Sequence, residues 1–293
     1  MRGFSLGLVV LSLSLGCGEQ GEKPYLTRFD RTMHISHQGG AEVFPSNTML
    51  AYEYAVVDYD TDVLEIDVHR TKDGVLVVLH DETVDRTTDG TGYVKEMTIE
   101  AVKALDAGYR FTTDDGQTFP YRGRGLTIPT LAEIFQAFPD MLTNIEVKQV
   151  SPHIESDLLR MIRDFHMQEK VCLGSFMEES AKILRQEMPE ACHYISEDMA
   201  TEFYIMHRVG LGGLHQLPID AVSFPFSFEK WGMDLTVLDE GMLNTMHDRG
   251  KAVWAWTIND KEDMKKLLDW GVDGIMTDRP DLLDEVMTEQ GVR

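Results

Sequence analysis

Glu65 and Asp67 are two acids within the apolar run Val63–Val68, and His80 follows after a short turn. Side chains alternate between the two faces of an extended strand, so both carboxylates point the same way. The turn at residues 71–74 reverses the chain and returns His80 to the level of the acids. Two oxygen ligands beside an imidazole predict metal-assisted acid–base chemistry. The alternative is a surface hairpin with solvated acids.

Polar residues also end two other apolar runs. His37 and Gln38 end the first run, and Glu146 and Lys148 end the run that starts at Leu142. If these runs are parallel strands of one barrel, their carboxyl ends meet at the rim where barrel enzymes carry their active sites. Three carboxylates and two histidines at one rim are hard to explain as packing, and we interpret them as a catalytic site.

Short apolar runs alternate with helical patterns from residue 33 onward, which indicates parallel strands with crossover helices. The four-residue turn before Val75 is too short for a crossover, so the run that follows must be the antiparallel arm of a hairpin. The other runs give the strand count of a (β/α)8 TIM barrel, a fold of the α/β class. The runs are Met33–His37, Val63–Val68, Val75–His80, Leu142–Val147, Val171–Phe176, Cys192–Ser196, Ile219–Phe224, Ala252–Thr257 and Val272–Thr277.

The chain between the hairpin and the next barrel strand is longer than one crossover needs. Residues 82–127, rich in glycine, threonine and aspartate, therefore predict a small insertion at the catalytic mouth. The insertion carries Arg122 and Arg124 beside aromatic residues. This segment is either a lid or a solvated turn.

The composition fits one globular domain. The chain has 293 residues, of which 43% are hydrophobic, enough for the single core of such a barrel. With 27 basic and 50 acidic residues the net charge is −23, so the surface repels phosphate-rich polymers and nucleic acid is not expected as a partner. An anionic substrate would need a local cationic device, such as a metal ion. No protein partner is inferred from the sequence.

The first residues have the features of an export signal. A charged residue precedes an apolar stretch over 4–15, which is too short to span a membrane, and Cys17 follows. The end of this stretch resembles the lipobox of bacterial lipoproteins, although Ser14 stands where leucine is usual. The expected divisions are a signal peptide over 1–17, a tether over 18–30 and the barrel domain over 31–293.

A lipid anchor at Cys17 would make the protein an exported lipoprotein on the periplasmic or cell-surface face of a membrane. Ordinary export and a retained leader are the alternatives. Cys172 and Cys192 are the other cysteines, and both fall in predicted strands. Buried thiols are the expectation, although neighbouring strands in an oxidising compartment would permit a disulfide.

The motifs around these residues resemble those of the glycerophosphodiester phosphodiesterase family, over nearly all of residues 33–283. Many motifs match in order, which makes the resemblance specific. It implies a TIM barrel that hydrolyses a glycerophosphodiester to glycerol phosphate and an alcohol. The matching motifs are His37-Gln38-Gly39, Pro45-Ser46-Asn47-Thr48, Leu64-Glu65-Ile66-Asp67-Val68, Thr71-Lys72-Asp73-Gly74 with Val77-Val78-Leu79-His80-Asp81, Ile128-Pro129-Thr130-Leu131, Asn144-Ile145-Glu146-Val147-Lys148, Trp256-Thr257-Ile258-Asn259 and Gly271-Val272-Asp273-Gly274-Ile275-Met276-Thr277-Asp278.

The resemblance also implies roles for individual residues. His37 and His80 would be the acid–base pair, and Lys148 would contact the substrate phosphate. Trp256, near a strand end, is expected in the substrate pocket, and Trp254 in the packing of the barrel. The implied ligands of a divalent cation, Ca²⁺ or Mg²⁺, are Glu65, Asp67 and Glu146.

Two positions depart from the family pattern. Gln38 stands where the family has arginine, and Ser46 where it has glutamate. Arginine meets phosphate with a charged fork, whereas glutamine offers only a neutral amide donor, so phosphate binding at Gln38 is the property most affected. Arg122 or Arg124 of the insertion is a hypothetical source of the missing charge.

Three functions follow from these features. The leading one is metal-dependent hydrolysis of small glycerophosphodiesters. A lysophospholipase D would use the same chemistry on a lysophospholipid, with the aromatic segment Phe224–Phe228 as an acyl-accepting rim. A catalytically silent binding lipoprotein is the third, because of Gln38 and Ser46. The two histidines beside three acids favour an enzyme.

Overall fold

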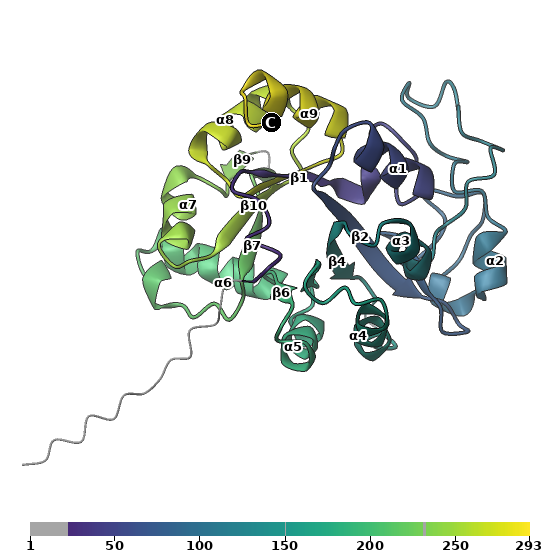
Figure 1. Ribbon diagram of the computed structural model, residues 1–293, viewed down its shortest axis with the longest axis horizontal. Helices are drawn as coiled ribbons and strands as arrows, with labels where there is room; N and C mark the ends of the chain where they lie inside the picture. The colour runs from purple at the N-terminus through teal and green to yellow at the C-terminus, as the bar shows by residue number, and fades with distance from the viewer. Residues whose placement is uncertain (1–22, 150, 231–232) are drawn as a thin grey trace, which may run out of the picture.

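The computed structural model describes residues 23–149, 151–230 and 233–293 (Figure 1). The expected signal peptide and the first part of the expected tether lie outside these residues. None of the helices in the described part of the chain has the length and hydrophobicity that a membrane span needs.

Parallel strands form a nearly closed barrel, which confirms the predicted TIM-barrel fold (Figure 1). The strands follow the order β6-β5-β4-β2-β1-β11-β10-β7 around the barrel, and a parallel bridge between Tyr194 and Ala221 joins β6 to β7. The barrel strands are β1 (Met33–Ser36), β2 (Val63–Arg70), β4 (Leu142–Val147), β5 (Val171–Gly174), β6 (Cys192–His193), β7 (Ala221–Pro225), β10 (Ala252–Trp256) and β11 (Gly274–Thr277).

The pairing of β2 with its neighbouring strands places Asp67 and Glu146 at the same level of the barrel. β2 runs parallel to β4, with Asp67 opposite Glu146. β3 (Leu76–Val78) runs antiparallel to the end of β2, which confirms the predicted hairpin. The amide of Leu79 donates to the carbonyl of Asp67 at 3.0 Å. His80, the next residue, therefore reaches the same rim as the acids.

Helices surround the barrel, and Figure 1 shows them outside the strands. Local capping sets their ends: Asp260 accepts hydrogen bonds from the amides of Glu262 and Asp263 at the start of α8, and Gly271 ends that helix with φ 77°. The helices are α1 (Met49–Val57), α2 (Ile99–Lys103), α3 (Leu131–Ala137), α4 (Glu155–Asp164), α5 (Glu178–Glu187), α6 (Glu197–Arg208), α7 (Glu240–His247), α8 (Lys261–Trp270), α9 (Pro280–Glu289), and the short 3₁₀ turns η1 (His37–Gly39), η2 (Val94–Glu96) and η3 (Gly212–Leu214).

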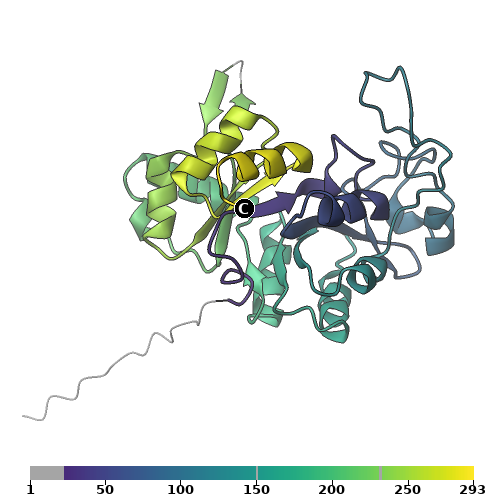
Figure 2. The ribbon, with the colours of Figure 1, turned by 45° about the horizontal axis from the view of Figure 1, so that its top comes forward.

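A second hairpin projects from the barrel after β7 (Figure 2). It consists of β8 (Ser227–Lys230) and β9 (Met233–Thr236), which form a sheet of their own. The sequence pattern did not predict it. Of the aromatic segment expected as an acyl rim, Phe224 is buried in the core, whereas Phe226 packs against Trp270 with ring centroids 5.9 Å apart.

The insertion over 82–127 has a small core of its own. Val84, Val94 and Val102 are buried together with Leu79 and Ile128. Figure 1 shows the insertion at the side of the barrel, next to α1 and α3. It therefore extends the barrel laterally from the end of the β2–β3 hairpin.

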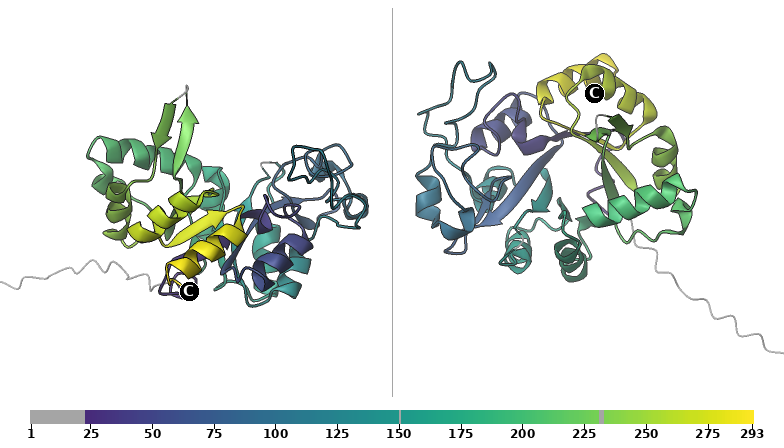
Figure 3. Two further views of the ribbon diagram at one scale, coloured as in Figure 1. Left: turned by 90° about the horizontal axis from the view of Figure 1, so that it is seen from above. Right: turned by 180° about the vertical axis from the view of Figure 1, so that it is seen from behind.

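The described part of the expected tether is folded against the barrel. Tyr25 is fully buried, its hydroxyl donates to the side-chain oxygen of Asn144, and its ring lies 6.1 Å from that of Trp254. Figure 3 shows this segment on the side of the barrel away from the β8–β9 hairpin. The prediction of a tether over the whole of 18–30 was therefore wrong for these residues, because a buried aromatic anchor fixes them.

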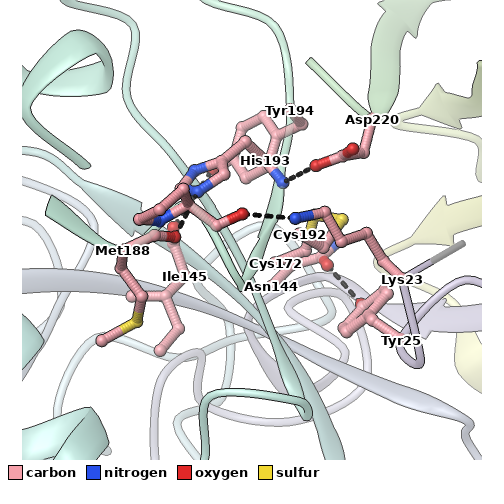
Figure 4. The surroundings of a disulfide bond; sticks show 11 residues. Lys23, Tyr25, Asn144, Ile145, Cys172, Met188, Cys192, His193, Tyr194 and Asp220 are labelled. Atoms are coloured by element: carbon pink, nitrogen blue, oxygen red, sulfur yellow. Dashed lines mark hydrogen bonds between the residues drawn. A yellow bond between two sulfur atoms is a disulfide. The ribbon is translucent and has the colours of Figure 1, made fainter. Parts of the chain in front are cut away.

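A disulfide joins Cys172 of β5 to Cys192 of β6 (Figure 4). The expectation of two buried thiols was wrong, because the parallel register places these residues opposite each other with their Cα atoms 4.3 Å apart. Tyr25 and Asn144 lie beside the bond (Figure 4). The disulfide thus fastens β6, the shortest barrel strand, next to the join with β7.

A Cys172→Ala/Cys192→Ala variant is expected to be less stable than the wild type by about 3 kcal/mol, because the bond closes a loop and limits the unfolded chain. The two cysteines are 20 residues apart in sequence. Urea denaturation followed by circular dichroism measures the difference. Reduced wild-type protein is the control, and it should unfold at the same urea concentration as the variant. Equal midpoints for the oxidised wild type and the variant would contradict a stabilising bond.

Candidate active site

Three carboxylates meet at the rim of the barrel. One oxygen of each of Glu65, Asp67 and Glu146 lies within 4.8 Å of the others. Asp67 is 1% exposed, and both its oxygens and Oε1 of Glu146 have no hydrogen-bond partner among the described residues. Buried carboxylate oxygens without partners are costly, and three of them in this arrangement fit a divalent cation with oxygen ligands.

The negative charges of the three acids repel one another, and this repulsion changes the pKa values of the carboxyl groups. Burial and the neighbouring charge of Asp67 raise the pKa of Glu65 to about 8. Burial, together with Asp67, also raises the pKa of Glu146 to about 7 although Lys148 opposes this. Carboxylates at such distances resist joint ionisation unless a cation neutralises them. The cluster therefore has the residue types and the spacing that a divalent cation would need.

Lys148 adds one positive charge to this rim. Its ammonium lies 3.0 Å from Oε2 of Glu146 and 3.3 Å from Oδ1 of Asp67. It also lies 4.4 Å from the ring centre of Phe176, a cation–π contact. Burial alone would lower the pKa of Lys148, but the charges of Asp67 and Glu146 outweigh it and raise the pKa. The side chain is thus a fixed cation beside the acids.

His37 begins the short turn after β1 and faces the acids. Its Nδ1 lies 2.6 Å from Oδ1 of Asp278, and its Nε2 lies 3.9 Å from Oε2 of Glu65. Asn259 donates to the other oxygen of Asp278 at 2.9 Å. Burial opposes the charged imidazole, but the hydrogen bond to Asp278 and the charge of Glu65 raise the pKa of His37 to about 9. Its Nε2 lies 3.3 Å from the side-chain nitrogen of Gln38.

His80 approaches the same rim from the end of the β2–β3 hairpin. Its Nδ1 lies 2.8 Å from Oδ1 of Asp81. Asp81 is held in turn by Arg86, whose Nε donates at 2.7 Å and whose Nη2 donates at 3.1 Å. Each histidine therefore has an aspartate at Nδ1, which leaves Nε2 as the nitrogen for proton transfer.

A pocket of about 1210 Å³ connects these groups. At its polar end it is lined by His37, Glu65, His80, Glu146 and Lys148. The pocket then continues between α6 and the start of the β8–β9 hairpin. Apolar and aromatic side chains line this outer part, among them Tyr204, Phe226 and Val237, and so do acidic ones such as Glu197 and Asp263.

Both tryptophans of β10 line the pocket, at different depths. Trp256 lies near the mouth, with its ring 6.5 Å from that of Phe176. Trp254 is fully buried in the barrel and forms part of the pocket floor. Gln38 is different: it is buried beside His37, with its side-chain nitrogen 3.3 Å from Nε2 of His37, and it is not among the pocket-lining residues.

The hypothesis that Arg122 or Arg124 supplies a charge to the phosphate was wrong. The guanidinium of Arg122 lies over the rings of Tyr109 and Phe119, 4.1 and 3.8 Å from their centres. The structure describes all of residues 82–127, and none of them lines the large pocket. Cation–π contacts inside the insertion therefore hold Arg122 away from the site.

Sequence reasoning also missed residues that organise the site. Asp278 and Asn259 appeared only as members of family motifs, and Arg86 was not singled out. Asp278 directly follows β11 (Gly274–Thr277), so its position at a carboxyl strand end was an available signal. Arg86 lies in the insertion, where no such rule applies.

Comparison with known proteins agrees with this geometry. A sequence model of the glycerophosphoryl diester phosphodiesterase family matches residues 37–282. A glycerophosphodiester phosphodiesterase of Caldanaerobacter subterraneus is 35% identical over 269 residues, which cover 89% of this chain and 100% of that protein. One of Bacillus subtilis is 31% identical over 296 residues, covering 97% of this chain and 96% of the relative.

More distant similarity extends to solved structures and to animal proteins. The crystal structure of a glycerophosphodiester phosphodiesterase from Agrobacterium tumefaciens has a TM-score of 0.69 at 26% identity, covering 87% of this chain and 99% of that one. A protein of Homo sapiens named lysophospholipase D is 25% identical over 283 residues, covering 87% of this chain and 85% of the relative. This chain therefore belongs to the glycerophosphoryl diester phosphodiesterase family.

Proposed function

We propose that this protein hydrolyses glycerophosphodiesters to glycerol phosphate and an alcohol, with the help of a divalent cation and two histidines. The observation that carries the proposal is the cluster of Glu65, Asp67 and Glu146, together with two histidines that line the same pocket and each have an aspartate at Nδ1. Family membership supports the same reaction class. Ca²⁺ and Mg²⁺ both take such oxygen ligands, and the cluster favours neither by its composition.

Each group of residues at the rim has its own role in the proposed hydrolysis. Glu65, Asp67 and Glu146 would hold the cation, which when bound neutralises negative charge on the phosphoryl oxygens. Lys148 places a further positive charge beside them. One histidine takes the proton of the attacking hydroxyl at Nε2, and the other gives a proton to the oxygen of the leaving alcohol.

The test is release of glycerol phosphate from glycerophosphocholine by the purified protein, with and without a chelator. We expect turnover that the chelator stops and that Ca²⁺ or Mg²⁺ restores. Folded protein that binds either ion but shows no turnover of any glycerophosphodiester would favour the alternative of a silent binding protein. Turnover that persists after complete removal of metal would contradict the role of the acid cluster.

A second candidate is a lysophospholipase D activity, which the outer part of the pocket favours. Tyr204, Phe226 and Val237 line it next to the polar end, and their apolar surface suits one acyl chain. Lysophosphatidylcholine and glycerophosphocholine should be compared as substrates. If the chain binds there, Phe226→Ser raises KM for the lysophospholipid and leaves glycerophosphocholine unaffected. Equal effects of the variant on both substrates would argue against an acyl site.

A Gln38→Arg variant is expected to lower KM for glycerophosphocholine by about tenfold, because a guanidinium binds phosphate with charged, paired hydrogen bonds and an amide does not. Gln38 lies beside His37, within reach of the rim. Steady-state kinetics and the inhibition constant of inorganic phosphate measure the effect. Gln38→Lys is the control, since it adds charge without the fork and should gain less. An unchanged inhibition constant in both variants would show that position 38 does not meet the phosphate.

We further propose that the protein is exported and anchored through Cys17, as the apolar leader indicates. The disulfide between Cys172 and Cys192 supports export, because such bonds persist mainly in oxidising compartments. Metabolic labelling with a fatty-acid analogue should label the wild type in the membrane fraction. A Cys17→Ser variant should stay unlabelled. Equal labelling of both proteins would contradict an anchor at Cys17.

A further inference from the structure

We propose that Asp81 and Arg86 form a positioning pair for His80, and that the insertion over 82–127 serves to hold Arg86 in place. The proposal rests on the hydrolysis proposed above and assigns two further residues to it. Neither residue is expected to touch the substrate. They act through the orientation and the tautomer of one imidazole.

Arg86 contacts Asp81, and Asp81 in turn contacts His80. His80 presents Nδ1 to one oxygen of Asp81 at 2.8 Å, and Arg86 donates to both oxygens of the same carboxylate at 2.7 and 3.1 Å. An arginine fork fixes the plane of a carboxylate as well as its position. With the carboxylate fixed, the proton of neutral His80 stays on Nδ1, and the lone pair on Nε2 faces the pocket.

The backbone of Arg86 is fixed from the insertion side. Val84, two residues earlier, is buried in the core of the insertion. Thr88, two residues later, closes the turn by donating from its hydroxyl to the carbonyl of Val84 at 2.7 Å. Arg110 then donates to the carbonyl of Thr88 at 3.0 Å. The insertion core thus fixes the backbone on both sides of Arg86, and Arg86 holds Asp81, which holds His80.

A stabilising role alone does not account for this pair. The side chain of Arg86 is 53% exposed and that of Asp81 is 28% exposed. Exposed ion pairs contribute little to stability, so variants at Arg86 should fold. His37 has the same arrangement with a different third residue, because its partner Asp278 is held by the neutral amide of Asn259 at 2.9 Å. Both histidines therefore have an aspartate whose position a further side chain secures.

The kinetic test compares Arg86→Gln, Arg86→Lys and Asp81→Asn with the wild type on glycerophosphocholine. We expect kcat to fall about 10-fold in Arg86→Gln and about 100-fold in Asp81→Asn, with KM nearly unchanged, as for other groups that orient an active-site imidazole. Arg86→Lys should recover part of the loss, since it restores a charged donor. Arg124→Gln, an arginine of the same insertion outside this network, is the matched control and should keep wild-type kcat.

A double variant and an NMR measurement test whether Arg86 acts through Asp81 on His80. In the Asp81→Asn background, Arg86→Gln should cause no additional loss, because Arg86 acts only through Asp81. Nitrogen NMR of His80 should report the Nδ1–H tautomer in the wild type and a mixture in Arg86→Gln, whether or not the protein turns over substrate. An unchanged tautomer or an unchanged kcat in Arg86→Gln would overturn the positioning role. Absence of turnover in the wild type with the tautomer change present would instead contradict the proposed function.

Discussion

Asp67→Asn is expected to reduce turnover of glycerophosphocholine by about 1,000-fold, because the cation supplies several kcal/mol of charge stabilisation and each 1.36 kcal/mol is a factor of ten. Asp67 is the most buried of the three acids, and neither of its oxygens has a hydrogen-bond partner among the described residues, although the ammonium of Lys148 lies 3.3 Å from Oδ1. Asparagine keeps the shape, removes the charge and turns a donor toward Glu65 or Glu146. Initial rates and calorimetric titration with Ca²⁺ and Mg²⁺ measure the two effects.

Stability measurements separate loss of the ion from loss of the fold. Without metal, Asp67→Asn should melt at or above the temperature of the wild type, since it removes one charge from a group of buried acids. Added metal should then stabilise only the wild type. Glu262→Gln, an exposed acid at the start of α8, is the matched control and should bind the ion normally. Normal ion affinity in Asp67→Asn would show that the cluster is not the metal site.

Replacing either histidine by glutamine is expected to lower kcat by about 10²- to 10⁴-fold, the range for removal of a general acid or base. Glutamine fills similar space and can hydrogen-bond the aspartate, but it transfers no proton. In the wild type these aspartates are Asp278 for His37 and Asp81 for His80. The double variant should be only slightly slower than the slower single variant, because the two histidines act together as the base and the acid of one reaction.

His247→Gln provides the control for this series. His247 is the last residue of α7, and its Nε2 lies 2.8 Å from Oδ2 of Asp273. It does not line the pocket. It should retain wild-type kcat. A loss of less than threefold in His80→Gln, with His37→Gln inactive, would reduce the mechanism to a single histidine.

The barrel was predictable because its strands alternate with helices and its single short turn forces a hairpin. The β8–β9 hairpin was missed, since the aromatic residues after Phe224 continue the pattern of β7 without a clear break. Phe224 enters the core while Phe226 packs outside the barrel on Trp270. Which of these neighbours lies inside depends on the tertiary fold, and no local pattern separates them.

The position of the acids was also predictable, because parallel strands bring their carboxyl ends together. The supports of the histidines were not. Asp278 is 241 residues from His37 in sequence, and Arg86, which holds Asp81, lies in an insertion whose fold no strand rule predicts. The disulfide depended in the same way on register: β5 and β6 place Cys172 opposite Cys192, and a one-residue slip would separate them.

The first described residues lie on the underside of the barrel, the side away from the β8–β9 hairpin (Figure 3). Lys23 donates to the carbonyl of Pro189, in the loop that precedes β6, and Tyr25 is buried under the pocket floor. From there to Cys17 an extended chain reaches about 20 Å at most. A lipid on Cys17 would hold this underside against the bilayer and turn the opening of the barrel toward the aqueous space. Such an enzyme would collect dissolved diesters that diffuse past it, and a lipid of its own membrane would have to leave the bilayer to be cleaved.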